Sequence, residues 1–445
     1  MVVPATTHGG KWQDVRARRS CGGIAGCSHA PTKPFASARG GTHLARVFRP
    51  GGQAMATALF WVCALGLLHT YVTYPLILVL LDAWAAFRAD LRYLGGGKDR
   101  RLPPEPLQLP RVSIVVAAWN EASVIREKIE NCLALDYPAH LLEVVVGSDG
   151  SDDGTDEIVS SFDDPRVRLD RAERRGKIGV LTRVVPTTSG EILVFSDANT
   201  LFAPDALRKL VRHFADRRVG CVCGRLRLYN RRHETFEESA YWVYESFLKL
   251  REGRRGAVMG ANGGIYALRR SLFPVLPPNT VVEDFVIAAR CLLRGLRVIY
   301  DPEAVALEET TEDYAKERRR RVRIAAGNFQ ALGLVGGLLH PRHGFTSFAF
   351  FSHKVLRWIA PLLLLGLFAA SVWLFPRPLY AAALGFQICF YWLAAIGYAV
   401  RLPGLAGRVA SLARYFVEMN VGMAHGFLRW IAGTQKVTWQ RTARA

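Results

Sequence analysis

The stretch EILVFSDANT (residues 191–200) joins a short apolar run to one carboxylate, Asp197, and one amide, Asn199. Apolar runs of this length, bounded by polar residues, are typical of strands buried inside a sheet. The stretches VSIVVAA (112–118) and LEVVVGS (142–148) have the same character. We therefore predict three buried strands, each followed directly by polar side chains.

Segments with helical character alternate with these strands. Residues 121–133 and 155–162 are amphipathic, and Pro204 opens a further predicted helix that ends near Phe214. Strands that alternate with helices indicate an α/β fold with a mostly parallel sheet covered on both faces. Ligands of such sheets bind beyond the carboxyl ends of the strands. The polar groups expected at that edge are Asn120 with Glu121, SDGSDDGTD (148–156) and Asp197.

Half of the 445 residues are hydrophobic, which is more than a soluble protein of this size usually has. Residues 55–81, 355–375 and 379–400 are long and apolar enough to cross a hydrocarbon core of about 30 Å. Residues 413–431 contain Glu418 and other polar groups, so they either span the membrane or lie in its surface. We therefore expect an α/β domain inserted between transmembrane helices.

The net charge of +20 has the same explanation, because many of the cations flank apolar segments, as in residues 88–101, 316–323 and 401–408. Cationic flanks are expected of cytoplasmic loops. The charge therefore indicates a membrane partner and argues against nucleic acid. The eight cysteines include no CxxC pair, which favours reduced cytosolic thiols.

Five regions are expected along the chain. Residues 1–54 are basic, rich in small residues and without apolar periodicity. They are a disordered tail, a transit peptide, or upstream sequence that is not translated; we favour the last because Met55 opens the first apolar segment. The other regions are a transmembrane helix (55–84), a linker (85–110), the α/β domain (111–333) and a membrane region with two or three transmembrane helices (334–445).

Three polar motifs of the α/β domain can bind a charged ligand. SDGSDDGTD would bind a polar nucleoside through Asp149, or it is a solvated turn that caps the next helix. The basic glycine loop RRGKIG (174–179) can meet a diphosphate. Asp197 and Asn199 can offer a carboxylate and an amide oxygen to one hard divalent cation, or Asp197 caps its own turn.

Two acids, Glu283 and Asp284, lie inside the apolar run VVEDF (281–285). A carboxylate with apolar neighbours tends to have a raised pKa, which a general base working near neutrality needs. The same two acids would also favour a helix N-terminus. Both interpretations can hold together.

The basic segment KERRRRVR (316–323) lies near the end of the α/β domain. An interfacial helix of this kind binds anionic headgroups. Arg319 and Arg323 are one helical turn apart, so they could also share a face toward a diphosphate. The sequence leaves both roles open.

The order of SDGSDDGTD, GK, SDANT, GANGGIYALRR, VEDF and RRVRI resembles that of the family 2 membrane glycosyltransferases, which include the cellulose, chitin, hyaluronan and poly-N-acetylglucosamine synthases. The resemblance covers residues 111–330 and the membrane segments around them. It implies a GT-A (Rossmann-like) fold. It also implies the inverting transfer of a sugar from a nucleotide sugar, usually UDP-linked, with Mg²⁺ or Mn²⁺ as cofactor.

The resemblance implies roles for single residues. Asp149 is similar to the aspartate that holds the uracil, and Lys177 to the lysine near the diphosphate. Asp197 is similar to the first acid of the metal motif, in which Asn199 takes the second position. Asp284 is similar to the catalytic base, with Glu283 beside it, and Arg323 to the arginine at the leaving diphosphate. GANGG resembles the loop beside the acceptor, with Gly260, Asn262 and Gly263. Asn120 and Glu121, at the end of the first strand, are expected on the nucleotide-sugar side.

Three positions depart from the family pattern. The second metal acid is Asn199, the glutamine of the QxxRW motif is Arg320, and its tryptophan is Ile324. Losing the tryptophan removes a sugar-stacking surface, which puts the synthesis of a long polymer in doubt. The membrane segments would then be a polysaccharide channel or a dock for a lipid-linked acceptor, and a silent scaffold is the rival from another class. We expect the plasma (inner) membrane with a cytosolic catalytic domain; the sequence does not indicate a partner subunit.

Overall fold

The computed structural model describes residues 50–94, 108–230, 235–236, 240–309, 314–400 and 402–435. The chain divides into two units, Met1–Arg49 and Pro50–Ala445, and the structural findings concern the second. Most of the expected tail (1–54) therefore lies outside the described residues. The expected linker (85–110) is described only at its ends, where residues 85–94 continue a helix.

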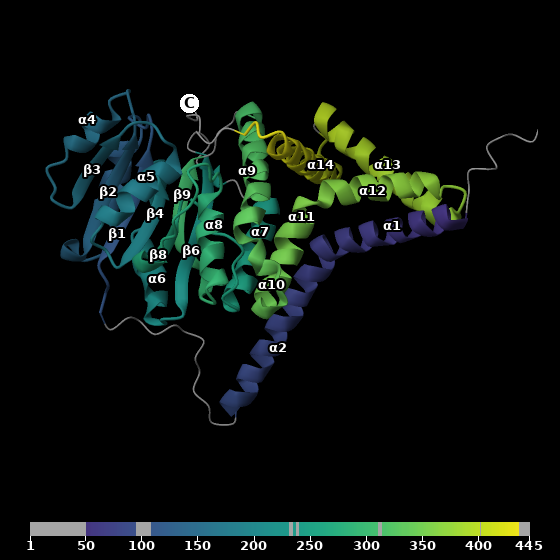
Figure 1. Ribbon diagram of the computed structural model, residues 1–445, viewed down its shortest axis with the longest axis horizontal. Helices are drawn as coiled ribbons and strands as arrows, with labels where there is room; N and C mark the ends of the chain where they lie inside the picture. The colour runs from purple at the N-terminus through teal and green to yellow at the C-terminus, as the bar shows by residue number, and fades with distance from the viewer. Residues whose placement is uncertain are drawn as a thin grey trace, which may run out of the picture. The chain divides into compact units, whose positions relative to one another are not determined.

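One mixed sheet forms the centre of the α/β domain (Figure 1). Within the described ranges it has nine strands in the order β3-β2-β1-β4-β8-β6-β9-β5, with β7 paired to β6. The strands are β1 (Val112–Ala118), β2 (Leu142–Asp149), β3 (Val167–Ala172), β4 (Ile192–Asp197), β5 (Thr200–Phe202), β6 (Val219–Asn230), β7 (Thr235–Phe236), β8 (Tyr266–Arg269) and β9 (Arg297–Glu309).

The predicted strands are β1, β2 and β4, and their ends meet at one edge. Ala117 of β1 is paired in parallel with both Gly147 of β2 and Asp197 of β4. The α/β fold is confirmed, but the sheet is mostly parallel only from β3 to β4. Beyond β4 the directions are mixed, because β8 starts at this edge, with Tyr266 opposite Phe195, and runs away from it.

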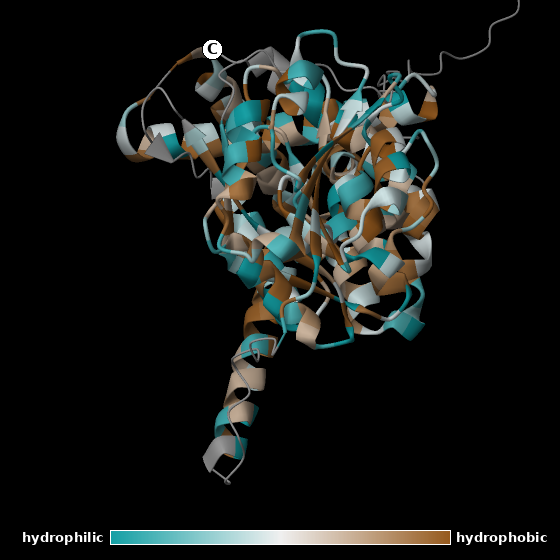
Figure 2. Ribbon diagram, turned by 90° about the vertical axis from the view of Figure 1, so that its left-hand side faces the viewer, coloured by the Kyte–Doolittle hydropathy of each residue, from teal (hydrophilic) through white to brown (hydrophobic). Residues whose placement is uncertain are grey.

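Helices cover both faces of the sheet, and alternate residues of the strands face two apolar clusters. Ile114 and Val116 of β1 pack with α3 (Ile125–Leu133), α4 (Thr155–Ser160) and α6 (Ala206–Val211). Val115 packs on the other face with α5 (Lys177–Val184), α7 (Ala240–Arg254) and α8 (Glu283–Leu293). Figure 2 shows the hydrophobic strands in the interior, between more hydrophilic outer segments. The prediction did not include α5.

The remaining helices are largely apolar on the outside. They are α1 (Pro50–Leu68), which continues through a π-helical turn (His69–Thr73) into α2 (Tyr74–Leu94), α9 (Tyr314–Val335), α10 (Phe345–Ala349), a second π-helical turn (Phe350–Val355), α11 (Leu356–Trp358), α12 (Ala360–Trp373), α13 (Pro378–Ala399) and α14 (Gly404–Ile431). Large side chains such as Leu65, Phe386 and Trp392 are exposed. In Figure 1, α7, α9 and α11 stand between the sheet and α12.

Three helices of the described chain are long and apolar enough to cross a membrane: Gly51–Arg92, Arg318–Leu339 and Pro378–Ala399. The expected span 355–375 is broken, because Phe345–Trp358 and Ala360–Trp373 form a pair bent by 63°. This bent pair is a broken span or a re-entrant loop. Residues 413–431 belong to α14, which is amphipathic and packs along α9 and α13.

The first apolar helix is tied to the α/β domain by charge. Asp82 of α2 is buried and accepts hydrogen bonds from Arg251 and Arg254 of α7 and from Arg255, which directly follows that helix. Three guanidinium groups around one carboxylate hold α2 against α7 in a fixed register.

The packing of α5 on β2 can be tested at Gly147, where a Cβ atom would overlap Cγ1 of Val180. Gly147→Ala should lower the free energy of unfolding by about 1–3 kcal/mol, because the core has no room for the methyl group. Thermal unfolding in detergent measures the effect. Adding Val180→Ala to that variant should restore part of the loss. A Gly147→Ala protein as stable as the wild type would contradict the close packing.

Candidate active site

The loops after β1 and β2 are fastened to each other at the ligand edge. Among the described non-glycine residues, only Asn120 has a positive φ, 56°. Its Nδ2 donates to Asp152 Oδ1 at 2.7 Å, and the Asp152 N–H donates to Asn120 Oδ1 at 3.0 Å. The Glu121 N–H donates to Thr155 Oγ1 at 2.8 Å. These bonds shape the loops, and contact of Asn120 and Glu121 with a nucleotide sugar stays a prediction.

Asp149, at the end of β2, is fully buried and fixes the turn that begins α5. Its Oδ1 accepts the N–H groups of Arg175 and Gly176 at 2.6 and 3.1 Å, and its Oδ2 accepts the latter at 3.0 Å. A carboxylate has about four acceptor positions, and these backbone hydrogen bonds take up three of them. The base contact stays a prediction, while the structure adds a role in placing the first residue of α5.

That first residue, Lys177, brings three of the predicted motifs together. Its Nζ lies 2.7 Å from Asp197 Oδ1 and 3.0 Å from Glu283 Oε1. Burial acts to lower the pKa of Lys177, but the two carboxylates outweigh burial and raise it. Burial acts to raise the pKa of Asp197, but the Lys177 ammonium outweighs burial and lowers it. The lysine therefore stays charged, and its single positive charge offsets part of the negative charge of the two acids.

Asp284 has the opposite character. Burial and the neighbouring Glu283 carboxylate raise its pKa to about 6. It lies in the first turn of α8, where its Oδ1 accepts the Phe285 N–H at 2.7 Å. The expectation of a helix N-terminus is therefore met at these acids, and the same position provides a carboxylate with the pKa of a base that works near neutrality.

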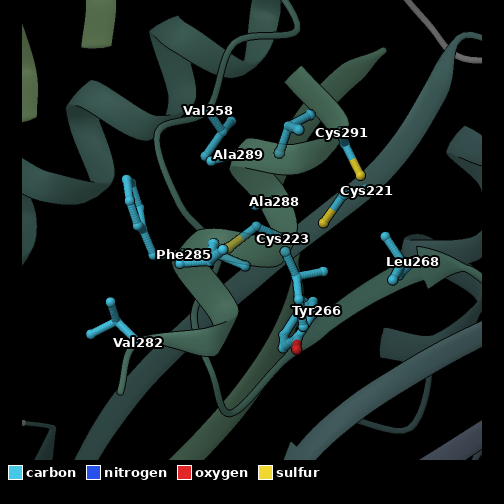
Figure 3. Close-up of a cluster of buried hydrophobic side chains, with 14 of the residues drawn as sticks. Cys221, Cys223, Val258, Tyr266, Leu268, Val282, Phe285, Ala288, Ala289 and Cys291 are labelled. Carbon is cyan, nitrogen blue, oxygen red and sulfur yellow. The ribbon is translucent and has the colours of Figure 1, made fainter. Parts of the chain in front are cut away.

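The loop of residues 259–264, which we call the acceptor-side loop after its predicted role, lies against Asp284. A Cβ atom on Gly263 would lie 3.1 Å from Asp284 Oδ2 and 3.7 Å from Lys177 Nζ. Gly260 has φ +105°, and a Cβ there would be 2.9 Å from the Phe285 ring. Figure 3 shows Phe285 among the apolar side chains of the cluster that also contains Cys223 and Val258. Backbone can lie this close to the base only where side chains are absent.

The side chain of Asn262 points into the protein. Its Nδ2 donates to the Gly224 carbonyl at 2.8 Å, and its Oδ1 accepts a hydrogen bond from Lys249 Nζ. Asn262 is thus used to hold the acceptor-side loop, and any part in acceptor binding would come through the shape of that loop. Acceptor contacts of Gly260 and Gly263 stay predictions.

The residues predicted to hold a metal fit an ion that is shared with a diphosphate. The Asp197 side chain is 37% exposed. The Nδ2 of Asn199 lies 3.5 Å from Glu308 Oε1, which turns its amide oxygen away from Glu308. Across the described part of the chain, no three His, Cys, Asp or Glu side chains form a group that could hold an ion. A magnesium ion is commonly bound by only one or two protein ligands when phosphate oxygens and water molecules complete its coordination shell.

Two further residues of the site were missed from the sequence. Glu308 lies opposite Thr200 in the β5–β9 pairing, far along the chain and outside any motif. Lys128 is fully buried, donates to the Thr200 carbonyl at 2.6 Å and acts electrostatically on Asp197. In the sequence it looks like one of several charges on an amphipathic helix, and only its burial distinguishes it.

The predicted leaving-group arginine lies on α9, which packs beside α8. Arg323 is half-buried and within electrostatic range of Glu283, Asp284 and Asp197. Arg319, its predicted neighbour on the same face, is exposed. Ile324, at the family's tryptophan position, packs against the apolar cluster of α8.

Comparison with known proteins gives the chain a family. The glycosyltransferase-like family 2 matches residues 110–327. A poly-β-1,6-N-acetyl-D-glucosamine synthase of Staphylococcus aureus is 26% identical over 236 residues, which are 51% of this chain and 56% of that protein. The probable glycosyltransferase YdaM of Bacillus subtilis is 26% identical over 237 residues, 50% of this chain and 56% of that protein. The chain thus spans about half the length of these relatives.

A solved structure shows the same fold. The mannosyltransferase of Pyrobaculum calidifontis, in complex with GDP-Man and Mn²⁺, is 24% identical, with a TM-score of 0.60 over 86% of this chain and 99% of that one. The sheet and its covering helices are therefore those of a GT-A fold. Residues 110–327 are therefore a glycosyltransferase-like family 2 domain.

Proposed function

We propose that the protein is a membrane glycosyltransferase that moves a sugar, with inversion, from a nucleotide sugar to a hydroxyl group of a glycan or lipid-linked acceptor. A UDP-linked donor fits best, by resemblance. The observation that carries the proposal is the meeting of Lys177 with Asp197 and Glu283 within 3.0 Å, directly beside Asp284 and a glycine loop. The candidate base Asp284, the cation Lys177 for a leaving diphosphate, and the glycine loop for an acceptor then lie next to each other.

The residues divide the reaction between them. Asp284 accepts the proton of the acceptor hydroxyl, and that oxygen attacks C1 of the sugar on the face opposite the diphosphate. The bond from C1 to the diphosphate oxygen breaks, and the electron pair leaves with the diphosphate. Lys177 and Arg323 place positive charge where this negative charge develops, which is usually the largest contribution to catalysis.

Asp197 and Asn199 would hold Mg²⁺ or Mn²⁺ together with the diphosphate. When bound, such an ion neutralises phosphate charge and favours departure of the leaving group. The mannosyltransferase with the same fold was solved with GDP-Man and Mn²⁺, which supports a divalent ion here without choosing between the two metals.

The apolar helices support a membrane location. Exposed side chains such as Leu65, Phe386 and Trp392 would face lipid, and the cationic flanks favour a cytosolic catalytic domain in the plasma (inner) membrane. Two acceptors are compatible with this arrangement: a growing polysaccharide, or a lipid-linked glycan extended once. Ile324 favours the second, because it packs into the apolar cluster and offers no ring for sugar stacking.

Transfer is tested by UDP or GDP release from the purified, detergent-solubilised protein. The donors are UDP-N-acetylglucosamine, UDP-glucose, UDP-galactose, UDP-glucuronate and GDP-mannose, each with Mg²⁺ or Mn²⁺, and the products are sized. One donor should turn over, and Asp284→Asn should lower its rate about 10²–10⁴-fold, because the base is lost. The matched control is Asp163→Asn, which changes an exposed aspartate far from Asp284 in the sequence. Folded protein that binds UDP and turns over none of these donors would contradict the proposal.

The pKa of Asp284 predicts the acid limb of the pH profile. The base works only when deprotonated, so kcat/KM should fall about tenfold per pH unit below pH 6. Glu283→Gln removes the neighbouring negative charge that helps to raise this pKa, so the limb should move to lower pH. Steady-state kinetics from pH 4.5 to about 8 would show the shift. A limb that stays in place, or moves to higher pH, would mean that another group titrates.

The metal role of Asn199 predicts two opposite effects. Asn199→Asp adds a carboxylate and should lower the Mn²⁺ concentration needed for half-maximal UDP binding by about tenfold. Asn199→Ala removes the amide oxygen and should raise that concentration. Calorimetric titration of UDP at several Mn²⁺ concentrations measures both without turnover. If all three proteins respond equally to Mn²⁺, residue 199 does not contact the ion.

A further inference from the structure

A histidine of the bent pair lies fully buried between two carboxylates of the α/β domain. His353 Nδ1 is 2.7 Å from Glu252 Oε1, and its Nε2 is 3.1 Å from both Glu245 oxygens. Tyr74 of α2 donates to the same Glu252 oxygen at 2.7 Å, and Arg357 donates to Glu245 at 3.0 Å. None of these groups has a part in the reaction derived above.

The two glutamates share one face of α7 with a lysine. Glu245, Lys249 and Glu252 follow each other at helical spacing, so they form a row along the helix. Lys249 Nζ donates to Asn262 Oδ1 in the acceptor-side loop. Glu252 Oε2 accepts the N–H of Met259, the first residue of that loop, at 3.3 Å. The row thus contacts His353 on one side, and the acceptor-side loop at Met259 and Asn262 on the other.

The acceptor-side loop and the bent pair also approach the base through packing. Gly263 lies against Asp284, because a Cβ atom at this glycine would be only 3.1 Å from the carboxylate oxygen Oδ2. Phe285, the next residue, is in contact with Phe350 at 6.4 Å and Trp358 at 5.8 Å between ring centroids. Both aromatic residues come from the bent pair. Polar and apolar contacts therefore connect the same membrane segment to the same catalytic turn.

A buried histidine between two carboxylates contributes little net stability, because removing these groups from water costs free energy and apolar side chains of similar volume stabilise a core as well or better. What such a network provides is one defined arrangement of its partners, since every displaced group would leave an unpaired polar atom. We propose that His353 is a positioning residue: it holds Glu252 and Glu245 of α7, the helix whose Glu252 and Lys249 bind the acceptor-side loop, and thereby sets that loop against Asp284. The proposal rests on the proposed function, and it assigns the bent pair a role in turnover.

The consequence differs for the two substrates. The loops after β1 and β2, which are predicted to bind the nucleotide, are held together by the hydrogen bonds between Asn120 and Asp152. These hydrogen bonds involve no residue of α7 or of the bent pair. Loss of the His353 contacts should therefore leave UDP binding unchanged while the base and the acceptor hydroxyl are misaligned. Misplacement by about 1 Å can cost about 10²-fold in rate.

The test compares His353→Gln, Lys249→Met and, as matched control, Ser352→Ala in the full-length protein in nanodiscs. Ser352 is the buried neighbour of His353, and its hydroxyl group meets His69 at 2.8 Å without touching α7. Three quantities are measured: hydrogen exchange of the peptide 257–265, UDP affinity with Mn²⁺, and kcat for the donor found above. His353→Gln keeps a side chain of similar size, so that the protein can still fold.

We expect His353→Gln to speed exchange of peptide 257–265 and to lower kcat about tenfold or more, with UDP affinity within about twofold of wild type. Lys249→Met should do the same, and the two substitutions together should cost less than the product of their single effects, since both act through one loop. Ser352→Ala should change none of the three quantities.

Unchanged exchange of peptide 257–265 in His353→Gln would overturn the proposal, and so would strictly multiplicative effects on kcat. Equal loss of UDP affinity and kcat would also overturn it, because it would show a general structural role. If the wild type releases no nucleotide from any donor, the proposed function fails, while the exchange experiment still decides whether His353 holds the loop.

Discussion

The site depends on one interaction, the pairing of the Lys177 ammonium with the carboxylates of Asp197 and Glu283. The end of β4, the start of α5 and the start of α8 each bring a charge into the same largely buried space. Unpaired charges there would cost several kcal/mol each, so the three elements are stable together only in this arrangement. Asp149 contributes by fixing the turn before Lys177. Burial and the neighbouring Glu283 carboxylate raise the pKa of Asp284 to about 6, against the opposing effect of the Lys177 charge.

The sequence predicted the elements whose signal is local. Strands β1, β2 and β4 are uniformly apolar runs that end in polar residues, and buried parallel strands look like this in any chain. The rule that ligands bind beyond the strand ends then placed Asp149 and Asp197 at one edge, as the register shows. Helix α5 was missed because the glycines at 176 and 179 make its first turn look like a loop. The 355–375 segment is apolar with one charged residue, Arg357, near its start, and apolar composition does not reveal a bend.

What the sequence could not predict depends on contacts between distant residues. Glu308 reaches Asn199 through strand pairing, and Lys128 reaches the carbonyl of Thr200 through helix packing. Neither has a motif around it. Asn262 shows the reverse case: its motif predicts a residue beside the acceptor, and the structure shows its side chain bonded inside the protein, so an acceptor role through the loop stays a prediction. A motif identifies where a loop lies, whereas the direction of each side chain is decided by the partners that surround it.

The apolar cluster under the site has one more consequence. It runs without interruption from Phe195 in the sheet through Phe285 to Phe350 and Trp358 of the bent pair. The catalytic domain therefore has no closed surface of its own on that side. A fragment ending near residue 335 would leave the apolar side chains beneath α8 without Phe350 and Trp358 as packing partners. A substitution in the bent pair at Phe350 or Trp358 would therefore be felt directly under Asp284, at Phe285.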